Sequence, residues 1–168
     1  MNNANRKPFF LLLALAVLVL DQWSKWWMDG HLDPRHPVPI VPDFLQLTHV
    51  RNPGVAFGMF ASEGLLATLA LVAVGLAALG AVALYFRRTP PREASLLLGL
   101  AMVLGGACGN LLDRVFAGSV TDFIDFHIGG HHWPAFNVAD SAISVAVVLV
   151  VVDAFRPRRS AAPPESTA

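Results

Sequence analysis

The sequence predicts an all-α membrane protein with four transmembrane helices and a small outward-facing β element and loop over a polar site. Three observations predict this class. Of the 168 residues, 55% are hydrophobic and 14% are charged, whereas an ordinary soluble domain has roughly 25% charged residues. Four apolar stretches approach the about 20 residues of helix that a bilayer requires. Polar residues gather where these stretches end.

The first predicted span covers residues 9–28, and its polar residues lie near its end, within residues 21–25. A secretory signal peptide also places basic residues before an apolar run, here Arg6 and Lys7, but it ends at a small-residue cleavage site. The polar run stands in that position instead. We therefore expect an uncleaved first helix.

The remaining spans are predicted at residues 64–86, 94–113 and 136–155. The second carries no charge, and the third carries none before its last residue. The fourth is less regular, because its uncharged β-branched run covers only residues 141–152. A full span must therefore begin earlier and include Asp140.

These spans are expected to form a single membrane domain over residues 1–156, with outer segments at 29–63 and 114–135. Partial alternation of polar and apolar residues over 44–50, before turn-forming residues, predicts a short strand in the first outer segment. Residues 157–168 have no periodicity and are predicted to be a disordered cytoplasmic tail.

The positions of the basic residues predict the orientation, because Lys and Arg concentrate in cytoplasmic loops. Eight of the twelve fall on one side of the predicted spans: Arg6, Lys7, Arg87, Arg88, Arg92, Arg156, Arg158 and Arg159. With three acidic residues this side carries +5, while four basic and nine acidic residues give the other side −5. The four Trp fall at the acidic boundary, where headgroups favour them. Both termini are therefore expected in the cytoplasm.

Several kinds of site are disfavoured by composition. The balance of 12 basic and 12 acidic residues provides no chain-wide basic surface for nucleic acid. Cys108 stands alone, so no internal disulfide forms, and an apolar helix disfavours its thiolate as a nucleophile. The neighbouring His131 and His132 point apart and no HExxH helix accompanies them. We predict no metal centre and no cofactor.

Ionisable residues within a span cost about 2.5–3.5 kcal/mol each on insertion scales and therefore mark candidate functional sites. Asp21 and Lys25 stand four apart on one helix face, and an ion pair that only sets helix depth also explains them. Asn110, Asp113 and Arg114 share a face at the end of the third span. A structural network and contact with a lipid phosphate or substrate backbone both remain open for these three residues.

Two acidic clusters, residues 122–126 and 136–141, are expected at the same membrane face. Asp140 has a structural explanation, because Asn137 at the N-cap would place it at N3 of a capping box. A second carboxylate beside it would form a dyad in which low dielectric and like charge separate the two pKa values, as water activation and amide hydrolysis require. Spacing leaves either Asp122 or Asp125 as the partner. On an extended segment these two side chains point to opposite sides.

Five blocks together resemble the bacterial lipoprotein signal peptidase family (signal peptidase II). They are Asp21-x-x-x-Lys25, NPGVAF at 52–57, GGACGNLLDR at 105–114, VTDF at 120–123 and FNVADS at 136–141. The resemblance implies an aspartic endopeptidase of the bacterial inner membrane. Such an enzyme removes the signal peptide from diacylglyceryl-modified prolipoproteins, cutting just before the lipidated cysteine at the outer face.

Carried over residue by residue, the resemblance places the catalytic pair at Asp122 and Asp140. The positions that it implies for substrate binding or site support are Asn52, Gly54, Asn110, Asp113, Arg114, Asn137, Asp21 and Lys25. It also implies a prolipoprotein substrate, contact with membrane phospholipid and inhibition by a cyclic lipopeptide such as globomycin, with no nucleic acid and no cofactor. A small β cradle and a mobile helix would cover the site. Residues 53, 55, 108 and 121 depart from the family's typical residues without replacing a functional position.

Two other classes remain open. A channel or transporter also carries intramembrane polar groups, but it usually places them near the midplane, and here they crowd one end. A non-catalytic membrane scaffold would need Asp122 and Asp140 only for structure. Substitution of either residue by Asn would then have a mild effect.

Overall fold

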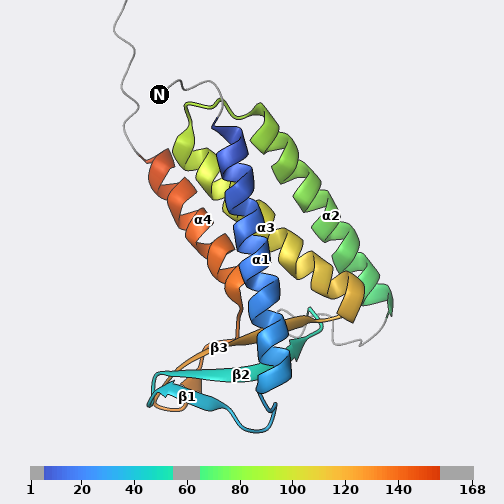
Figure 1. The fold of residues 1–168 in the computed structure, drawn as a ribbon, viewed down its shortest axis with the longest axis vertical. Coiled ribbons are helices and arrows are strands. Elements are labelled where there is room, and N and C mark those ends of the chain that lie inside the picture. The colour runs from blue at the N-terminus through green and yellow to red at the C-terminus, as the bar shows by residue number, and fades with distance from the viewer. Residues whose placement is uncertain (1–5, 55–64, 156–168) are drawn as a thin grey trace, which may run out of the picture.

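Four helices and four short strands make up the part of the chain that the computed structural model describes, residues 6–54 and 65–155. The helices are α1 (Lys7–His31), α2 (Leu65–Arg88), α3 (Ala94–Ala117) and α4 (Val138–Ala154). The strands are β1 (Val38–Val41), β2 (Leu45–Asn52), β3 (Val120–Ile128) and β4 (His131–His132). The helices run along the long axis of the molecule and the sheet crosses one end (Figure 1).

The helices α1, α2 and α3 are long and apolar enough to cross a membrane. They overlap the predicted spans, but α3 continues beyond the predicted end at residue 113 to Ala117. Arg114 therefore belongs to the helix and not to the outer segment 114–135. The helix α4 begins later than the predicted start at 136, because Asn137 is its N-cap. The predicted tail at 157–168 lies outside the described residues.

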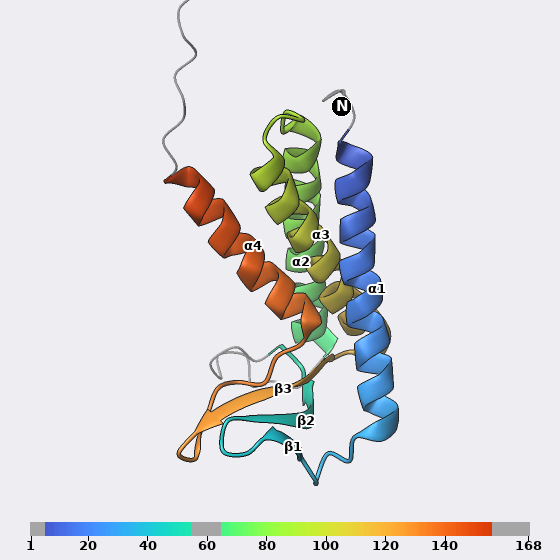
Figure 2. The same ribbon diagram turned by 60° about the vertical axis from the view of Figure 1, so that its left-hand side comes forward.

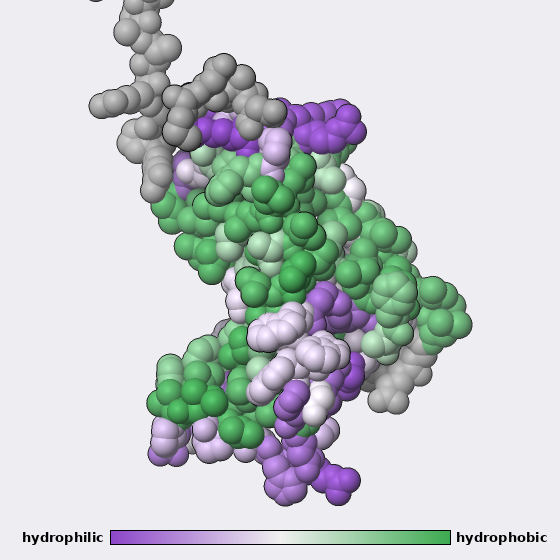
Figure 3. Space-filling view, viewed as in Figure 1, coloured by the Kyte–Doolittle hydropathy of each residue, from purple (hydrophilic) through white to green (hydrophobic). Residues whose placement is uncertain are grey.

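The surface of the bundle is apolar. None of the most hydrophobic stretch of α2 is buried, and its Leu66 and Val74 are among the exposed large side chains. Figure 3 shows hydrophobic residues covering the bundle, with hydrophilic residues at its far end and at its junction with the sheet. A helix that is hydrophobic on all sides yet exposed is typical of contact with lipid.

The helix α3 packs against the other three helices. Its glycines permit this close approach: a Cβ at Gly105 would collide with the backbone of Ala14 on α1. A Cβ at Gly106 would lie 2.7 Å from the carbonyl oxygen of Ala139 on α4. Small residues allow helix backbones to approach in this way in membrane proteins. Both α1 and α4 therefore pack closely on α3.

The sheet is antiparallel, with strand order β1-β2-β3-β4. The predicted short strand at 44–50 is confirmed as β2, displaced by one residue at its start and two at its end. The register of β2 and β3 pairs Val50 with Asp122 and Gln46 with Asp125, with an irregularity between these pairs. The sheet lies beside the start of α4, which leans away from the other helices toward its C-terminus (Figure 2).

A left-handed turn connects α3 to β3. Gly118, at the C-cap of α3, has φ +72°, a conformation that costs glycine little and other residues more. At the other end, the backbone of Phe136 bonds to Ile124 in both directions, at 2.8 and 3.0 Å. Strand β3 is thus fixed between the end of α3 and the start of α4.

Candidate active site

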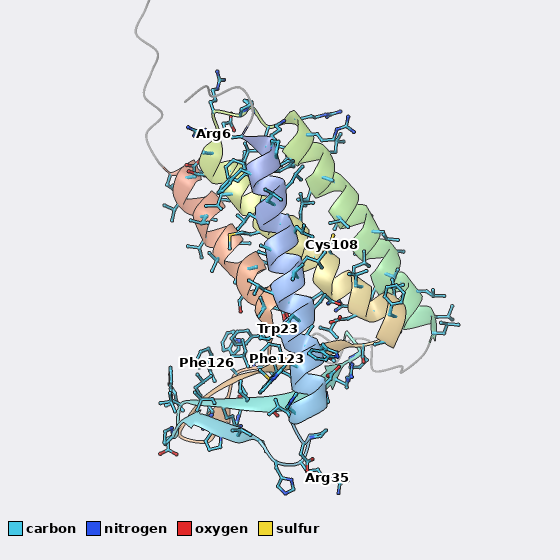
Figure 4. All side chains as sticks on the ribbon, in the orientation of Figure 1. Arg6, Trp23, Arg35, Cys108, Phe123 and Phe126 are labelled. Atoms are coloured by element: carbon cyan, nitrogen blue, oxygen red, sulfur yellow. The ribbon has the colours of Figure 1, made fainter. Side chains whose placement is uncertain are left out.

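Polar side chains from α1, α3, β2, β3 and α4 meet where the bundle joins the sheet. Figure 4 shows Phe123 of the sheet near the level of Trp23 on α1, which marks this junction. Cys108 lies farther into the bundle on α3 in the same view. The N-terminus of α4, strand β3 and the last turns of α3 come together at this junction.

Asp122 is buried on β3, with 2% of its surface exposed. Its two oxygens accept hydrogen bonds from separate amides: Asn52 Nδ2 at 2.9 Å and Asn137 Nδ2 at 2.7 Å. Burial raises the pKa of this carboxyl, Asn52 lowers it, the charge of Asp140 raises it, and Asn137 and Lys25 lower it, which together give a pKa of about 6. Asp122 is therefore suited to be the protonated carboxyl that a dyad requires.

Asp140 stands at N3 of α4, and the capping box expected from the sequence is confirmed. Asn137 Oδ1 accepts from the Asp140 backbone N–H at 3.0 Å, and Asp140 Oδ2 accepts from the Asn137 N–H at 3.3 Å. The other carboxylate oxygen accepts from Asn110 Nδ2 at 2.8 Å. The capping box uses only Oδ2 of Asp140. It therefore does not explain the hydrogen bond between Oδ1 and Asn110 on α3. A helix N-terminus is a favourable place for a carboxylate.

Asn137 connects the two carboxyl groups. Its side chain is completely buried, and its amide nitrogen donates to Asp122 while its carbonyl oxygen caps the backbone of Asp140. The same amide nitrogen lies 3.2 Å from Asn110 Oδ1 and 3.3 Å from the Thr121 carbonyl oxygen. One asparagine thus sets the relative position of a carboxylate on β3 and a carboxylate on α4.

Lys25 supports this arrangement from α1. Its ammonium donates to Asp21 Oδ2 at 2.7 Å and to Asn110 Oδ1 at 2.8 Å, and it forms an ion pair with Asp113 Oδ2 at 2.7 Å. The predicted ion pair with Asp21 is present, and it is buried, with 3% of Lys25 and none of Asp21 exposed. A pair that only sets helix depth at the interface would not be enclosed in this way.

Asp21 also reaches α4, because its Oδ1 accepts from the backbone N–H of Ala139 at 2.9 Å. Gly109 of α3 faces this carboxylate so closely that a Cβ there would collide with Asp21 Oδ2.

Two residues of this network were not identified from the sequence. Gln22 donates to Asp113 at 2.9 Å, and only its place in the polar run 21–25 pointed to it. Gly109 carries no polar group, and only its place in the block at 105–114 pointed to it.

Arg114 and Gly54 lie together at the edge of the site. Arg114 Nη1 donates to the Asn110 carbonyl oxygen at 3.0 Å, as the predicted shared face requires. Its Nε is buried and has no hydrogen-bond partner among the described residues. Gly54 adopts φ +99°, and its N–H donates to Asn52 Oδ1 at 2.9 Å. The expected mobile helix over the site falls partly on residues 55–64, outside the described residues.

Asp125 lies apart from this group, as an extended segment requires. It accepts from Gln46 Nε2 at 2.6 Å and lies 2.8 Å from His132 Nδ1, and neither partner contacts Asp140. Asp122 and not Asp125 therefore shares partners with Asp140. Of the two carboxylates that spacing left open, Asp122 is the one that Asn137 links to Asp140.

Comparison with known proteins identifies the family. Residues 13–156 match the sequence profile of signal peptidase (SPase) II. The chain belongs to this family. It is 42% identical over 151 residues to the lipoprotein signal peptidase of Syntrophus aciditrophicus (strain SB), which covers 88% of this chain and 94% of that protein. The lipoprotein signal peptidase of Geobacillus kaustophilus (strain HTA426) is 43% identical over 143 residues, with coverage of 85% and 90%.

Two solved structures share the fold of this chain. A bacterial membrane enzyme determined by the in meso method at 2.3 Å resolution matches with a TM-score of 0.80 and 26% identity, over 93% of this chain and 95% of that chain. A second, at 1.9 Å, matches with a TM-score of 0.79 and 27% identity, over 90% of this chain and 95% of that chain. Signal peptidase II is a family of membrane-embedded peptidases. Membership of this chain in the family implies that it removes signal peptides from prolipoproteins.

Proposed function

We propose that this signal peptidase II is an aspartic endopeptidase that cuts diacylglyceryl-modified prolipoproteins just before the lipidated cysteine. Asp122 and Asp140 are the proposed catalytic pair. The observation that carries the proposal is the bridge between them, in which one buried asparagine, Asn137, bonds to both carboxylates. Two carboxyl groups held together at low dielectric suit general acid and general base catalysis.

In the proposed reaction, ionised Asp140 removes a proton from a water molecule as its oxygen attacks the scissile carbonyl carbon. Protonated Asp122 hydrogen-bonds the developing oxyanion and then donates its proton to the leaving amine as the C–N bond breaks. The proton that Asp140 took from water then restores the acid form of Asp122. The raised pKa of Asp122 supports this division, as does the position of Asp140 at a helix N-terminus.

The test is a cleavage assay with the purified enzyme in detergent. We expect a diacylglyceryl-modified prolipoprotein to be cut and the same prolipoprotein without the lipid to be left intact, with Asp140→Asn as the inactive control. Equal cleavage of the two substrates would contradict the proposed substrate class. Cleavage by Asp140→Asn at the parent's rate would contradict the catalytic role proposed for Asp140.

We also propose four membrane spans, with both termini in the cytoplasm of a bacterial cell and the site at the outer face of the inner membrane. The 17 residues of α4 rise about 26 Å at about 1.5 Å each, slightly less than the about 30 Å of hydrocarbon. The proposed orientation places the start of α1 and the end of α2 on the same side of the membrane. These two helix ends lie together, because Lys7 Nζ donates to the Arg87 carbonyl oxygen at 2.7 Å. The acyl chains and signal helix of the substrate would remain in lipid while the cleavage site enters the polar junction.

The proposed topology predicts which positions an impermeant thiol reagent reaches. In a Cys108→Ser background, His36→Cys and His131→Cys are expected to be labelled from outside intact spheroplasts, because both positions lie at the sheet end. Arg88→Cys lies at the opposite end of α2 and is expected to react only after the membrane is opened. Labelling of Arg88→Cys in intact spheroplasts would reverse the proposed orientation.

The pH dependence of cleavage should reflect Asp122. Its pKa is raised to about 6, so its acid form is fully present below the pKa and is lost as the pH rises through it. We expect log(kcat/KM) to fall above about pH 6. Asn52 donates to the ionised carboxylate at 2.9 Å and holds its pKa down, so Asn52→Leu should move this limb to higher pH. A limb that stays in place would contradict the role of Asp122 as the acid.

Arg114 is predicted to contribute more to substrate binding than to the stability of the fold. Its guanidinium retains an unpartnered Nε among the described residues, which fits a phosphate or a backbone carbonyl of the substrate. Arg114→Lys keeps the charge but loses the planar fork. We expect kcat/KM for lipidated substrate to fall about 10- to 100-fold, the equivalent of one charge-assisted hydrogen bond, with an unchanged melting temperature. Parent-like cleavage by Arg114→Lys would refute the prediction.

A further inference from the structure

A second polar cluster, which we call the hairpin cluster, consists of Asp125, His127 and His132 on the β3–β4 hairpin. Asp125 and His127 are two apart on β3 and therefore share a face of the strand. His132 is the cross-strand partner of His127 in the β3–β4 register, and partners in a ladder also share a face. One coordinating atom from each residue lies within 4.8 Å of the other two.

The members of the hairpin cluster are already held in place. His132 Nδ1 lies 2.8 Å from Asp125 Oδ2, and the rings of His127 and His132 stack with centroids 4.9 Å apart. Gln46 Nε2 donates to Asp125 Oδ2 at 2.6 Å. Within the described residues, His127 Nδ1 is buried and has no hydrogen-bond partner. His127 thus has a ring nitrogen available for a ligand, and it belongs to a group in which a carboxylate and a second imidazole also offer ligand atoms.

The chemistry of these side chains selects the ligand. Two imidazoles and one carboxylate form a ligand set that suits Zn²⁺, with bonds of about 2.0–2.2 Å. Ligand atoms on one such ion lie at most about 4 Å apart, so movements of about 1 Å would complete the site. Gln46 would act as the outer partner that orients the carboxylate. His132, whose side chain is 49% exposed, leaves a path to solvent for the ion and for a water ligand.

We propose that the hairpin cluster is a Zn²⁺ site that fastens β4 to β3. This differs from the sequence prediction of no metal centre, which considered the neighbours His131 and His132. The structure pairs His132 instead with His127, across the strands. The spacing is Asp125-x-His127-x4-His132, which becomes a ligand set only once the hairpin register is known.

The proposed ion is distinct from the catalytic pair and takes no part in cleavage. Asp122 is three residues from Asp125 and points to the opposite side of the strand, toward Asn137. The expected effect of the ion is on stability, because the chain after β4 leads directly to Phe136, whose carbonyl oxygen accepts from the backbone N–H groups of Phe123 and Ile124. Fastening the hairpin would therefore stabilise the connection between β3 and the start of α4.

The experiment is a metal titration of the full chain in detergent, purified without a polyhistidine tag and freed of chelator. Co²⁺ absorption reports the ligand geometry, and competition with Zn²⁺ gives the affinity. The parent should bind one equivalent of Zn²⁺. We expect His127→Phe and Asp125→Asn each to weaken binding by more than about 100-fold, and Gln46→Ala to weaken it by about 10-fold, as for outer-shell partners. Zn²⁺ should also raise the melting temperature of the parent.

The matched control is His131→Gln, which removes the exposed neighbour of His132 from the same hairpin. This variant should bind Zn²⁺ and gain thermal stability from it as the parent does, whereas metal-free Asp125→Asn should fold and melt with no response to Zn²⁺. The proposal is overturned if the parent binds no more tightly than His127→Phe. Equal weakening by His131→Gln would also overturn it, because adventitious binding to surface histidines would then explain the titration.

Discussion

Asp122→Asn and Asp140→Asn are each expected to abolish prolipoprotein cleavage, while Asp125→Asn retains most of it. Asn cannot take or give the proton that each role requires, so the loss in kcat should reach about 100- to 10,000-fold. Asp125 differs because its partners are Gln46 and His132. The measurement is the cleavage rate of lipidated substrate by enzyme that purifies and melts normally.

Asp125→Asn is the matched control, because it makes the same chemical change three residues along the same strand. The double variant of Asp122 and Asp140 should be no slower than either single variant, since removal of one member already disables the step. Substantial cleavage by Asp122→Asn would exclude it as a catalytic group. A mild effect at both positions would instead favour the membrane scaffold that the sequence left open.

Local patterns predicted those features that one segment determines by itself. Apolar length alone indicated α1, α2 and α3, and the spacing of Asn137 and Asp140 indicated the capping box that the structure contains. The opposite directions of Asp122 and Asp125 follow from the alternation of a strand. In each case the residues that interact lie within a few positions of one another.

Contacts between distant segments could not be predicted in this way. Asn52 meets Asp122 because β2 and β3 pair in one register, and a hydrophobic pattern along one strand does not specify its partner. Lys25 reaches Asp113 only because α1 and α3 pack closely. The hairpin cluster likewise depends on the pairing of His127 with His132. The end of α3 at Ala117 was missed because charged residues at 113 and 114 resemble a helix boundary while packing buries them in part.

Lys25→Met is expected to cause a large loss of stability, although the Lys25 ammonium donates its hydrogen bonds to neither of the proposed catalytic carboxylates. It lies between Asp21 and Asp113, at 2.7 Å from each. Methionine keeps the apolar stem but leaves two carboxylates together without a cation. Removing one partner of a buried ion pair costs about 3–5 kcal/mol, so the variant should melt far below the parent in detergent and show no cleavage.

A compensated variant separates the fold from the chemistry. Asp21→Asn and Asp113→Asn, added to Lys25→Met, remove both unpaired charges, and the amide oxygen introduced at position 21 can still accept the N–H of Ala139. We expect this triple variant to recover most of the melting temperature. Cleavage should stay at least about 10-fold below the parent, because Asn110 loses the 2.8 Å contact with Lys25 that turns its amide toward Asp140. If Lys25→Met melted like the parent, the buried network would not hold the site together.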